Sequence, residues 1–297
     1  MCGIAGLFIK DKNLEPQLGA LLSEMTSTLC GRGPDSAGFA LYSHPDAGKV
    51  KLSVRGEDGI DLNELGAELS KELGQDVGVT IRHTHAVFSV PESSVSKAIS
   101  WIDENPEKVS LVGQGQRLEI YKEVGYPTDV ANEFGISKIA GTHGISHTRM
   151  ATESRVSADG AHPFSTGSDQ CLVHNGSLSN HASLRRTLRD NGIVIRTNND
   201  SEVAAGYISR ELRDGSSLGS ALENSLDDLD GFFTFVVGTE NGFGVLRDPI
   251  ACKPAVMAET DQYIAFASEY KSLTCLPGIE DARIWEPTPA HSYFWEH

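Results

Sequence analysis

The sequence has little positive charge. It carries 25 lysines and arginines against 41 aspartates and glutamates, a formal net charge of −16 over 297 residues. That balance repels nucleic acid and anionic membrane surfaces, so neither is expected as a partner. The apolar opening, Gly3 to Ile9, lacks a basic leader and meets Lys10, Asp11 and Lys12 too soon for a signal peptide or a membrane span. We therefore expect a cytoplasmic protein that binds a small zwitterion or another protein.

Cysteines are also few, and their spacing excludes two common roles. The five are odd in number, widely separated and without a Cys-x-x-Cys pair, so neither a disulfide framework nor a zinc site is expected. His83 and His85 would place two imidazoles on one face of a strand, but no third ligand lies nearby in the sequence. We interpret this pair as structural and expect no metal or cofactor in this chain.

Cys2 stands apart from the other cysteines because it follows the initiator methionine. Removal of Met1 would leave Cys2 with both a thiol and a free α-amine. An α-amine has an unperturbed pKa near ~8, so it can accept the thiol proton and return it to a leaving group. The alternative is that Cys2 packs as a small hydrophobic side chain.

Hydrophobic periodicity predicts a chain of mixed helices and strands. Gly3 to Ile9 is typical of a buried strand, and leucines spaced from Leu18 to Leu29 indicate a helix. Residues 49–112 alternate strand, helix, strand, helix, strand, with one strand expected over Val77 to Val90. We interpret them as a compact α/β subdomain inserted into a domain of residues 2–297. Elsewhere, runs of strands and runs of helices favour a layered α+β fold over a parallel doubly wound sheet.

Three further segments carry groups suited to binding or chemistry. Arg149, at a predicted strand end, can grip a carboxylate with two parallel hydrogen bonds, although it can also be an ordinary surface arginine. Asn175 and Gly176 follow an apolar strand and can donate to an oxyanion, each donor being worth about 3 kcal/mol; the alternative is a plain Asn-Gly turn. Asp200 lies at a helix start, where it can bind an ammonium group or serve as the N-cap.

Taken in order, the motifs of this chain resemble the class II, or N-terminal nucleophile, glutamine amidotransferases. The motifs are Met-Cys-Gly-Ile at residue 1, Arg-Gly-Pro-Asp-Ser-Ala-Gly at 32, His-Thr-Arg-x-Ala-Thr at 147, His-Asn-Gly at 174, Asp-Ser-Glu at 200, Arg-Asp-Pro at 247 and Ala-Ser-Glu at 267. The resemblance implies a four-layer αββα sandwich. It also implies a reaction in which a cysteinyl thioester forms, ammonia leaves and water releases glutamate.

The same resemblance implies a role for each candidate site residue. Cys2 would be the nucleophile and its own amine the base. Asn175 and Gly176 would form the oxyanion hole. The substrate L-glutamine would be held by the candidate binding residues Arg149, Thr152 and Asp200.

The chain ends at His297 without an acceptor-processing domain, so we expect a separate polypeptide to use the ammonia. A stand-alone chain of this length resembles the amidotransferase component of split glutamate-synthase-like systems, such as the first component of N-methylglutamate synthase. That resemblance implies a hetero-oligomer with an FMN-binding synthase subunit, an iron–sulfur group in the partner, and a further chain bearing a Gly-x-Gly-x-Gly domain. Glutamine-derived ammonia and free methylamine both remain open as the amine donor. So do two other functions: a different N-terminal cysteine amidase, and a non-catalytic assembly subunit.

Overall fold

The computed structural model describes residues 2–151 and 156–297. A first sheet has the strand order β15-β13-β14-β1-β8-β2-β7. Its strands are β1 (Gly3–Ile9), β2 (Ser36–Tyr42), β7 (Leu118–Val124), β8 (His143–Arg149), β13 (Val256–Glu259), β14 (Tyr263–Ala267) and β15 (Arg283–Trp285). A second sheet has the order β16-β12-β11-β10-β9. It comprises β9 (Phe164–Gly167), β10 (Gln170–Leu178), β11 (Gly231–Gly238), β12 (Gly242–Arg247) and β16 (Ser292–Glu296).

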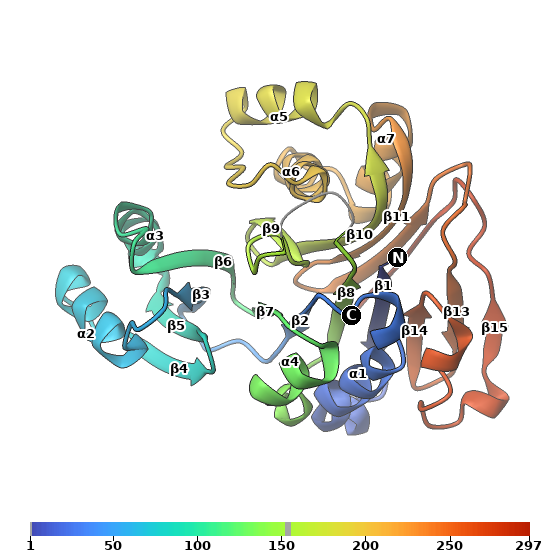
Figure 1. Ribbon diagram of the computed structural model, residues 1–297, viewed down its shortest axis with the longest axis horizontal. Coiled ribbons are helices and arrows are strands. Elements are labelled where there is room, and N and C mark those ends of the chain that lie inside the picture. The colour runs from blue at the N-terminus through green and yellow to red at the C-terminus, as the bar shows by residue number, and fades with distance from the viewer. Residues whose placement is uncertain (1, 152–155) are drawn as a thin grey trace.

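Helices cover the outer faces of these two sheets, and the sheets pack against each other (Figure 1). On the first sheet lie α1 (Leu18–Ser27) and α4 (Pro127–Glu133). Around the second sheet lie α5 (His181–Asp190), α6 (Asp200–Arg213) and α7 (Leu218–Asp228). Between the sheets, Ile4 and Phe8 of β1 meet Val173 of β10 in a buried apolar cluster. The predicted mixture of helices and strands is therefore present, and the antiparallel pairing of the named strands excludes a parallel doubly wound sheet.

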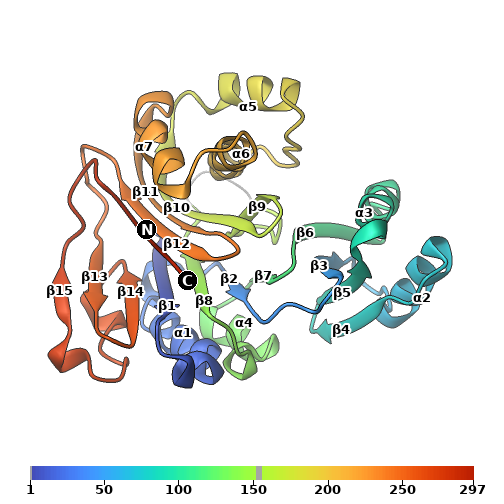
Figure 2. The same cartoon turned by 180° about the vertical axis from the view of Figure 1, so that it is seen from behind.

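A third sheet lies to one side of this body, on the side away from β13 to β15 (Figure 2). Its order is β4-β5-β3-β6, with β3 (Lys49–Gly56), β4 (Gly78–Arg82), β5 (His85–Pro91) and β6 (Val109–Gly115). Two helices, α2 (Leu62–Leu73) and α3 (Val95–Glu104), bury one of its faces. Ion pairs join it to β7: Lys51 Nζ lies 2.9 Å from Glu119 Oε1, and Arg55 Nε lies 3.2 Å from Glu123 Oε2.

One sequence prediction in this sheet is wrong. Residues 77–90 form a hairpin of two strands, β4 and β5, instead of one strand. The turn lies at His83, whose φ is +50°, so His83 is on a turn and only His85 is on a strand. The two imidazoles consequently do not share a strand face.

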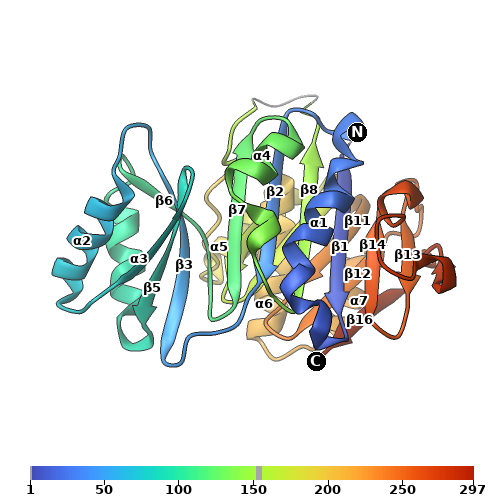
Figure 3. The same cartoon turned by 90° about the horizontal axis from the view of Figure 1, so that it is seen from below.

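β1 is the central element for function because Cys2 directly precedes it. It pairs with β14 on one side and β8 on the other, and all seven of its residues are buried. The chain ends lie at opposite ends of this strand (Figure 3). Among the residues described, no helix is both long and apolar enough to cross a membrane; the cytoplasmic location stays a prediction.

Candidate active site

Cys2 directly precedes β1 and is half-buried; pairing with β8 begins at the next residue, Gly3, opposite Thr148. Two hydrogen bonds with Ser268 fix the strand beside it: Ile4 N–H donates to Ser268 Oγ at 2.9 Å, and Ser268 N–H donates to Ile4 O at 2.9 Å. Gly3 has no room for a side chain, because a Cβ there would lie 2.8 Å from Thr148 Oγ1. The position of Cys2 is therefore set by close packing of its immediate neighbours.

Two side chains from distant segments donate to the backbone carbonyl of Cys2. Arg32 donates from Nε at 2.9 Å, and Asn175 donates from Nδ2 at 3.3 Å. Glu269 holds Arg32 in place through an Oε1 to Nη1 contact of 2.7 Å, and its other oxygen lies 2.8 Å from Lys271 Nζ. Hydrogen bonds from Lys271 and Arg32 lower the pKa of the Glu269 carboxyl below its usual value.

Arg32 and Glu269 are functional candidates that the sequence analysis did not assign. Both belong to motifs quoted there, Arg-Gly-Pro-Asp and Ala-Ser-Glu. Their place in these motifs was the signal in the sequence that could have identified them. Their joint role arises from a contact between segments 237 residues apart, which no local spacing reveals.

Asn175 and Gly176 lie within β10, which continues to Leu178, so their predicted place after the strand is wrong. The strand extends because β11 pairs with it as far as Leu178 opposite Gly231. On the other edge, β9 pairs only with residues 170 and 172. Leu178 N–H donates to Asp200 across that edge. Because backbone N–H groups alternate along a strand, the Gly176 N–H points to the same edge.

Arg149 is the last residue of β8 and is 9% exposed. Asp35 holds this strand end: its N–H donates to Arg149 O at 3.0 Å, and its Oδ2 accepts from Ala151 N–H at 2.9 Å. The turn at Gly33 approaches β8 so closely that a Cβ there would lie 2.4 Å from Thr148 C. Thr152, the other predicted binding residue beside Arg149, lies outside the described residues.

Asp200 is the first residue of α6, and it is not the N-cap. Asn199 is the cap, because its side chain accepts from Ser201 N–H at 2.9 Å. The Asp200 carboxylate instead reaches β10, where Oδ2 accepts from Leu178 N–H at 2.9 Å. The candidate ammonium-binding group is thereby tied to the strand that carries Asn175 and Gly176.

A buried histidine joins the two sheets at this point. His147 Nε2 on β8 lies 3.2 Å from the carbonyl oxygen of His174 on β10. Burial lowers the pKa of His147 to about 3, so the ring is neutral near pH 7 and Nε2–H can donate to that carbonyl. The ring of His162 stacks on His147 with centroids 4.0 Å apart. Together these contacts hold β10, which carries Asn175, against β8, the strand paired with β1.

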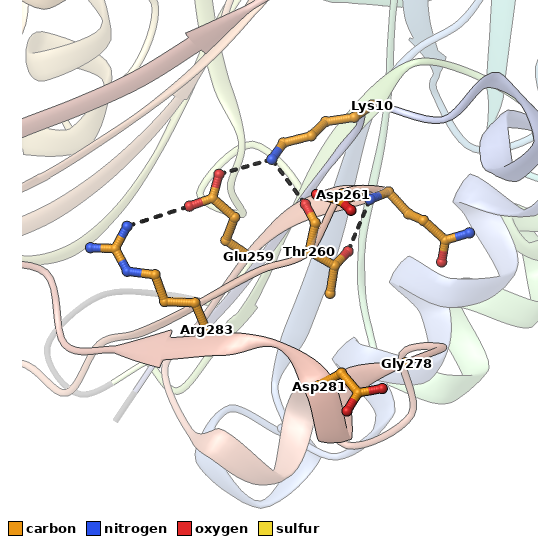
Figure 4. A pocket seen from close by; sticks show the side chains of 8 residues that line it. Lys10, Glu259, Thr260, Asp261, Gly278, Asp281 and Arg283 are labelled. Carbon is orange, nitrogen blue, oxygen red and sulfur yellow. Dashed lines mark hydrogen bonds and ion pairs between the residues drawn. The ribbon is translucent and has the colours of Figure 1, made fainter.

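A hollow of about 490 Å³ lies away from Cys2, beyond the other end of β1 (Figure 4). Its two cations share one carboxylate: Lys10 Nζ lies 2.8 Å and Arg283 Nη1 lies 3.6 Å from Glu259 oxygens. Asp261 and Asp281 also line it, so the hollow has no excess positive charge for an anion. Within the described ranges, no three His, Cys, Asp or Glu side chains cluster as metal ligands.

Comparison with known proteins identifies the family. A family model described as a glutamine amidotransferase domain matches residues 147–275. The chain is 56% identical over 298 residues to the glutamine amidotransferase-like protein GlxB of Rhizobium meliloti, covering 100% of this chain and 99% of the relative. It is 35% identical over 284 residues to a putative glutamine amidotransferase of Methanothermobacter thermautotrophicus, covering 92% and 93%.

A solved structure shows the same fold at lower identity. The glutamine phosphoribosylpyrophosphate amidotransferase from B. subtilis superposes with a TM-score of 0.63 at 20% identity, covering 99% of this chain and 47% of that chain. The family predicted from the order of the motifs is thus confirmed along nearly the whole sequence. The chain belongs to the class II glutamine amidotransferases.

Proposed function

We propose that the protein hydrolyses the side-chain amide of glutamine at Cys2 and delivers the ammonia to a partner. The observation that carries this proposal is the convergence of Arg32 Nε and Asn175 Nδ2 on the Cys2 carbonyl. These contacts would orient the terminal residue, and one of them comes from a predicted oxyanion donor. Precise orientation of a nucleophile against its substrate is a major source of rate acceleration.

The proposed reaction uses only groups of this chain and one water. After Met1 is removed, the Cys2 amine takes the thiol proton, and Sγ attacks the amide carbon of glutamine. One Asn175 Nδ2–H bonds the Cys2 carbonyl; the second N–H of that amide and the Gly176 N–H stabilise the oxyanion. The ammonium of Cys2 returns its proton to the amide nitrogen, the C–N bond breaks and ammonia leaves. Water then attacks the thioester, which releases glutamate and restores the thiol.

In this proposal, the substrate is held at both of its charged ends. The Arg149 guanidinium binds the α-carboxylate with two parallel hydrogen bonds. Asp200 binds the α-ammonium, supported by its bond to the β10 backbone. An apolar acyl amide has no use for such a pair of opposite charges, which favours glutamine over other amide substrates.

We further propose that the acceptor is a glutamate-synthase-like FMN subunit with an iron–sulfur group, accompanied by a Gly-x-Gly-x-Gly subunit. The proposal draws on the likeness of this chain to the glutamine amidotransferase-like protein of Rhizobium meliloti over 99% of that relative's length. The proposed product is N-methylglutamate or a related amino acid. Residues 49–112 are proposed as an inserted subdomain that serves assembly, and the two main sheets with their helices as the αββα sandwich of the N-terminal nucleophile hydrolases.

A glutaminase assay with matched cysteine variants tests this function. We expect glutamate release from glutamine by the wild-type chain mixed with its partner subunits, and less than 1% of that rate, an order-of-magnitude estimate, for Cys2→Ala. Cys252→Ala is the matched control, because Cys252 is exposed and free. It should retain the wild-type rate. Equal activity of Cys2→Ala and wild type would refute the catalytic role; a correctly processed but inactive wild-type complex would favour a purely structural role in assembly.

A further inference from the structure

The imidazole of His174 lies against the candidate substrate-binding carboxylate. His174 is 3% exposed, and its Nδ1 lies 2.9 Å from Ser201 Oγ. That hydroxyl lies 3.3 Å from Asp200 Oδ1, while His174 Nδ1 itself lies 4.0 Å from the same oxygen. The serine hydroxyl therefore sits between the ring and the carboxylate.

We propose that His174 is a positioning residue for Asp200, acting through Ser201. In this arrangement, the Ser201 hydroxyl donates to His174 Nδ1, which fixes Ser201 in the first turn of α6, directly after Asp200. Leu178 N–H holds Asp200 Oδ2 at 2.9 Å. With the start of the helix and one carboxylate oxygen both held, the carboxylate keeps one orientation toward the α-ammonium of the substrate. This inference rests on the proposed glutaminase function.

The protonation state of the ring supports this direction of donation. Burial lowers the pKa of His174 to about 4, although the charge of Asp200 partly opposes that shift. The ring is thus neutral near pH 7 and carries one N–H. The Phe232 backbone carbonyl also forms a hydrogen bond with the ring, which opposes the effect of burial on its pKa. That carbonyl lies beside Nε2, because a Cβ at Gly176 would lie 2.0 Å from Phe232 O and 2.7 Å from His174 Nε2. The single ring proton is therefore assigned to Nε2, and Nδ1 accepts from the Ser201 hydroxyl.

The surroundings of His174 hold its ring in this place. The ring meets Phe235 edge to face, with centroids 5.1 Å apart and planes at 66°. At Gly176 a Cβ would lie 2.7 Å from His174 Nε2, so the absence of a side chain there makes room for the ring. His147 fixes the His174 backbone from the opposite sheet. Because the ring is held on these sides, it can hold the Ser201 side chain, and with it Asp200, in one position.

Two substrates separate a positioning role from general structural support. Glutaramate is glutamine without its α-ammonium, so its hydrolysis cannot use Asp200 in the proposed way. Loss of one neutral hydrogen bond from His174→Leu should raise the KM for glutamine about tenfold and change kcat about twofold or less. The kcat/KM for glutaramate should change by about twofold or less. His174→Asn, which can place its amide oxygen near the position of Nδ1, should recover most of the loss.

The outcomes distinguish this inference from the proposed function. If the wild-type complex hydrolyses neither substrate, the glutaminase function fails. If it hydrolyses glutamine but His174→Leu weakens both substrates equally, the positioning role is refuted. Should the variant not fold, nitrogen-15 NMR of wild-type histidines decides: a proton on Nε2 of His174 leaves Nδ1 to accept from Ser201 and supports the positioning role, and a proton on Nδ1 overturns it.

Discussion

The contact between Arg32 and the Cys2 carbonyl should control the rate of glutamine hydrolysis. The Arg32 side chain is 10% exposed, and its Nε donates to that carbonyl at 2.9 Å. A hydrogen bond from a charged donor contributes about 1.5–3 kcal/mol. If Arg32→Met removes that amount from the orientation of the nucleophile, kcat should fall about 10- to 150-fold. Arg32→Lys keeps the charge but not the fork of donors, so it should lie between methionine and wild type.

The same change should have a moderate effect on stability. Glu269 would lose Arg32 but keep Lys271 at 2.8 Å, and its side chain is 30% exposed. No buried carboxylate is left unpaired and Asn175 still donates to the Cys2 carbonyl, so the loss of unfolding free energy should be no more than about 1.5–3 kcal/mol. The expected result is therefore a large decrease in kcat with a moderate decrease in Tm.

Steady-state glutaminase kinetics and thermal unfolding, measured on the same preparations, test this prediction. Lys271→Met is the control, because it removes the other partner of Glu269 at an exposed position and leaves the Arg32 contact with Cys2 in place. Its kcat should stay within about twofold of wild type. A folded Arg32→Met protein with an unchanged kcat would refute the reasoning.

Two further predictions concern substrate binding and acid stability. Arg149→Lys should raise the KM for glutamine by about tenfold or more while leaving Tm nearly unchanged, because lysine cannot form the paired hydrogen bonds; an unchanged KM would remove Arg149 from the site. Burial lowers the pKa of His85, His143 and His147 to about 3, from 6.5 in the unfolded chain. Between the two pKa values the unfolded state therefore binds more protons than the folded state. These histidines contribute fully to the free energy of unfolding above pH 6.5. Below that pH their contribution falls by about 1.4 kcal/mol per histidine for each pH unit. The free energy of unfolding in urea, measured from pH 7 to pH 5, should show that slope. In His143→Asn the slope should be smaller by the contribution of one histidine. A free energy that does not change with pH would contradict the prediction.

The elements with a clear period could be predicted from the sequence. β1 covers Gly3–Ile9 as expected, and the leucine spacing locates α1 to within a turn. The short edge strands β9 and β15 were not predicted. Each is hydrogen-bonded to a single neighbouring strand and has little apolar alternation in its sequence. The hairpin at His83 was missed because its turn lacks the usual Asn-Gly or Asp-Gly signal.

The candidate site shows the same division between local and long-range information. The motif order identifies Cys2, Asn175 and Asp200 as candidates, and the structure ties Cys2 to Asn175, and Asp200 to the same strand. Arg32 and His174 gain their proposed roles only through contacts across the fold. Such roles depend on which strands become neighbours in the fold. The spacing of residues along one sequence does not reveal which strands these are.

The most direct test of the central claim is mass spectrometry of the chain's first peptide, taken from an active complex quenched during glutamine turnover. The account predicts a peptide that begins at Cys2 with a free α-amine, a fraction of which carries a glutamyl group on the thiol. Active protein that quantitatively retains Met1, or a glutamyl group found on a different residue, would contradict it.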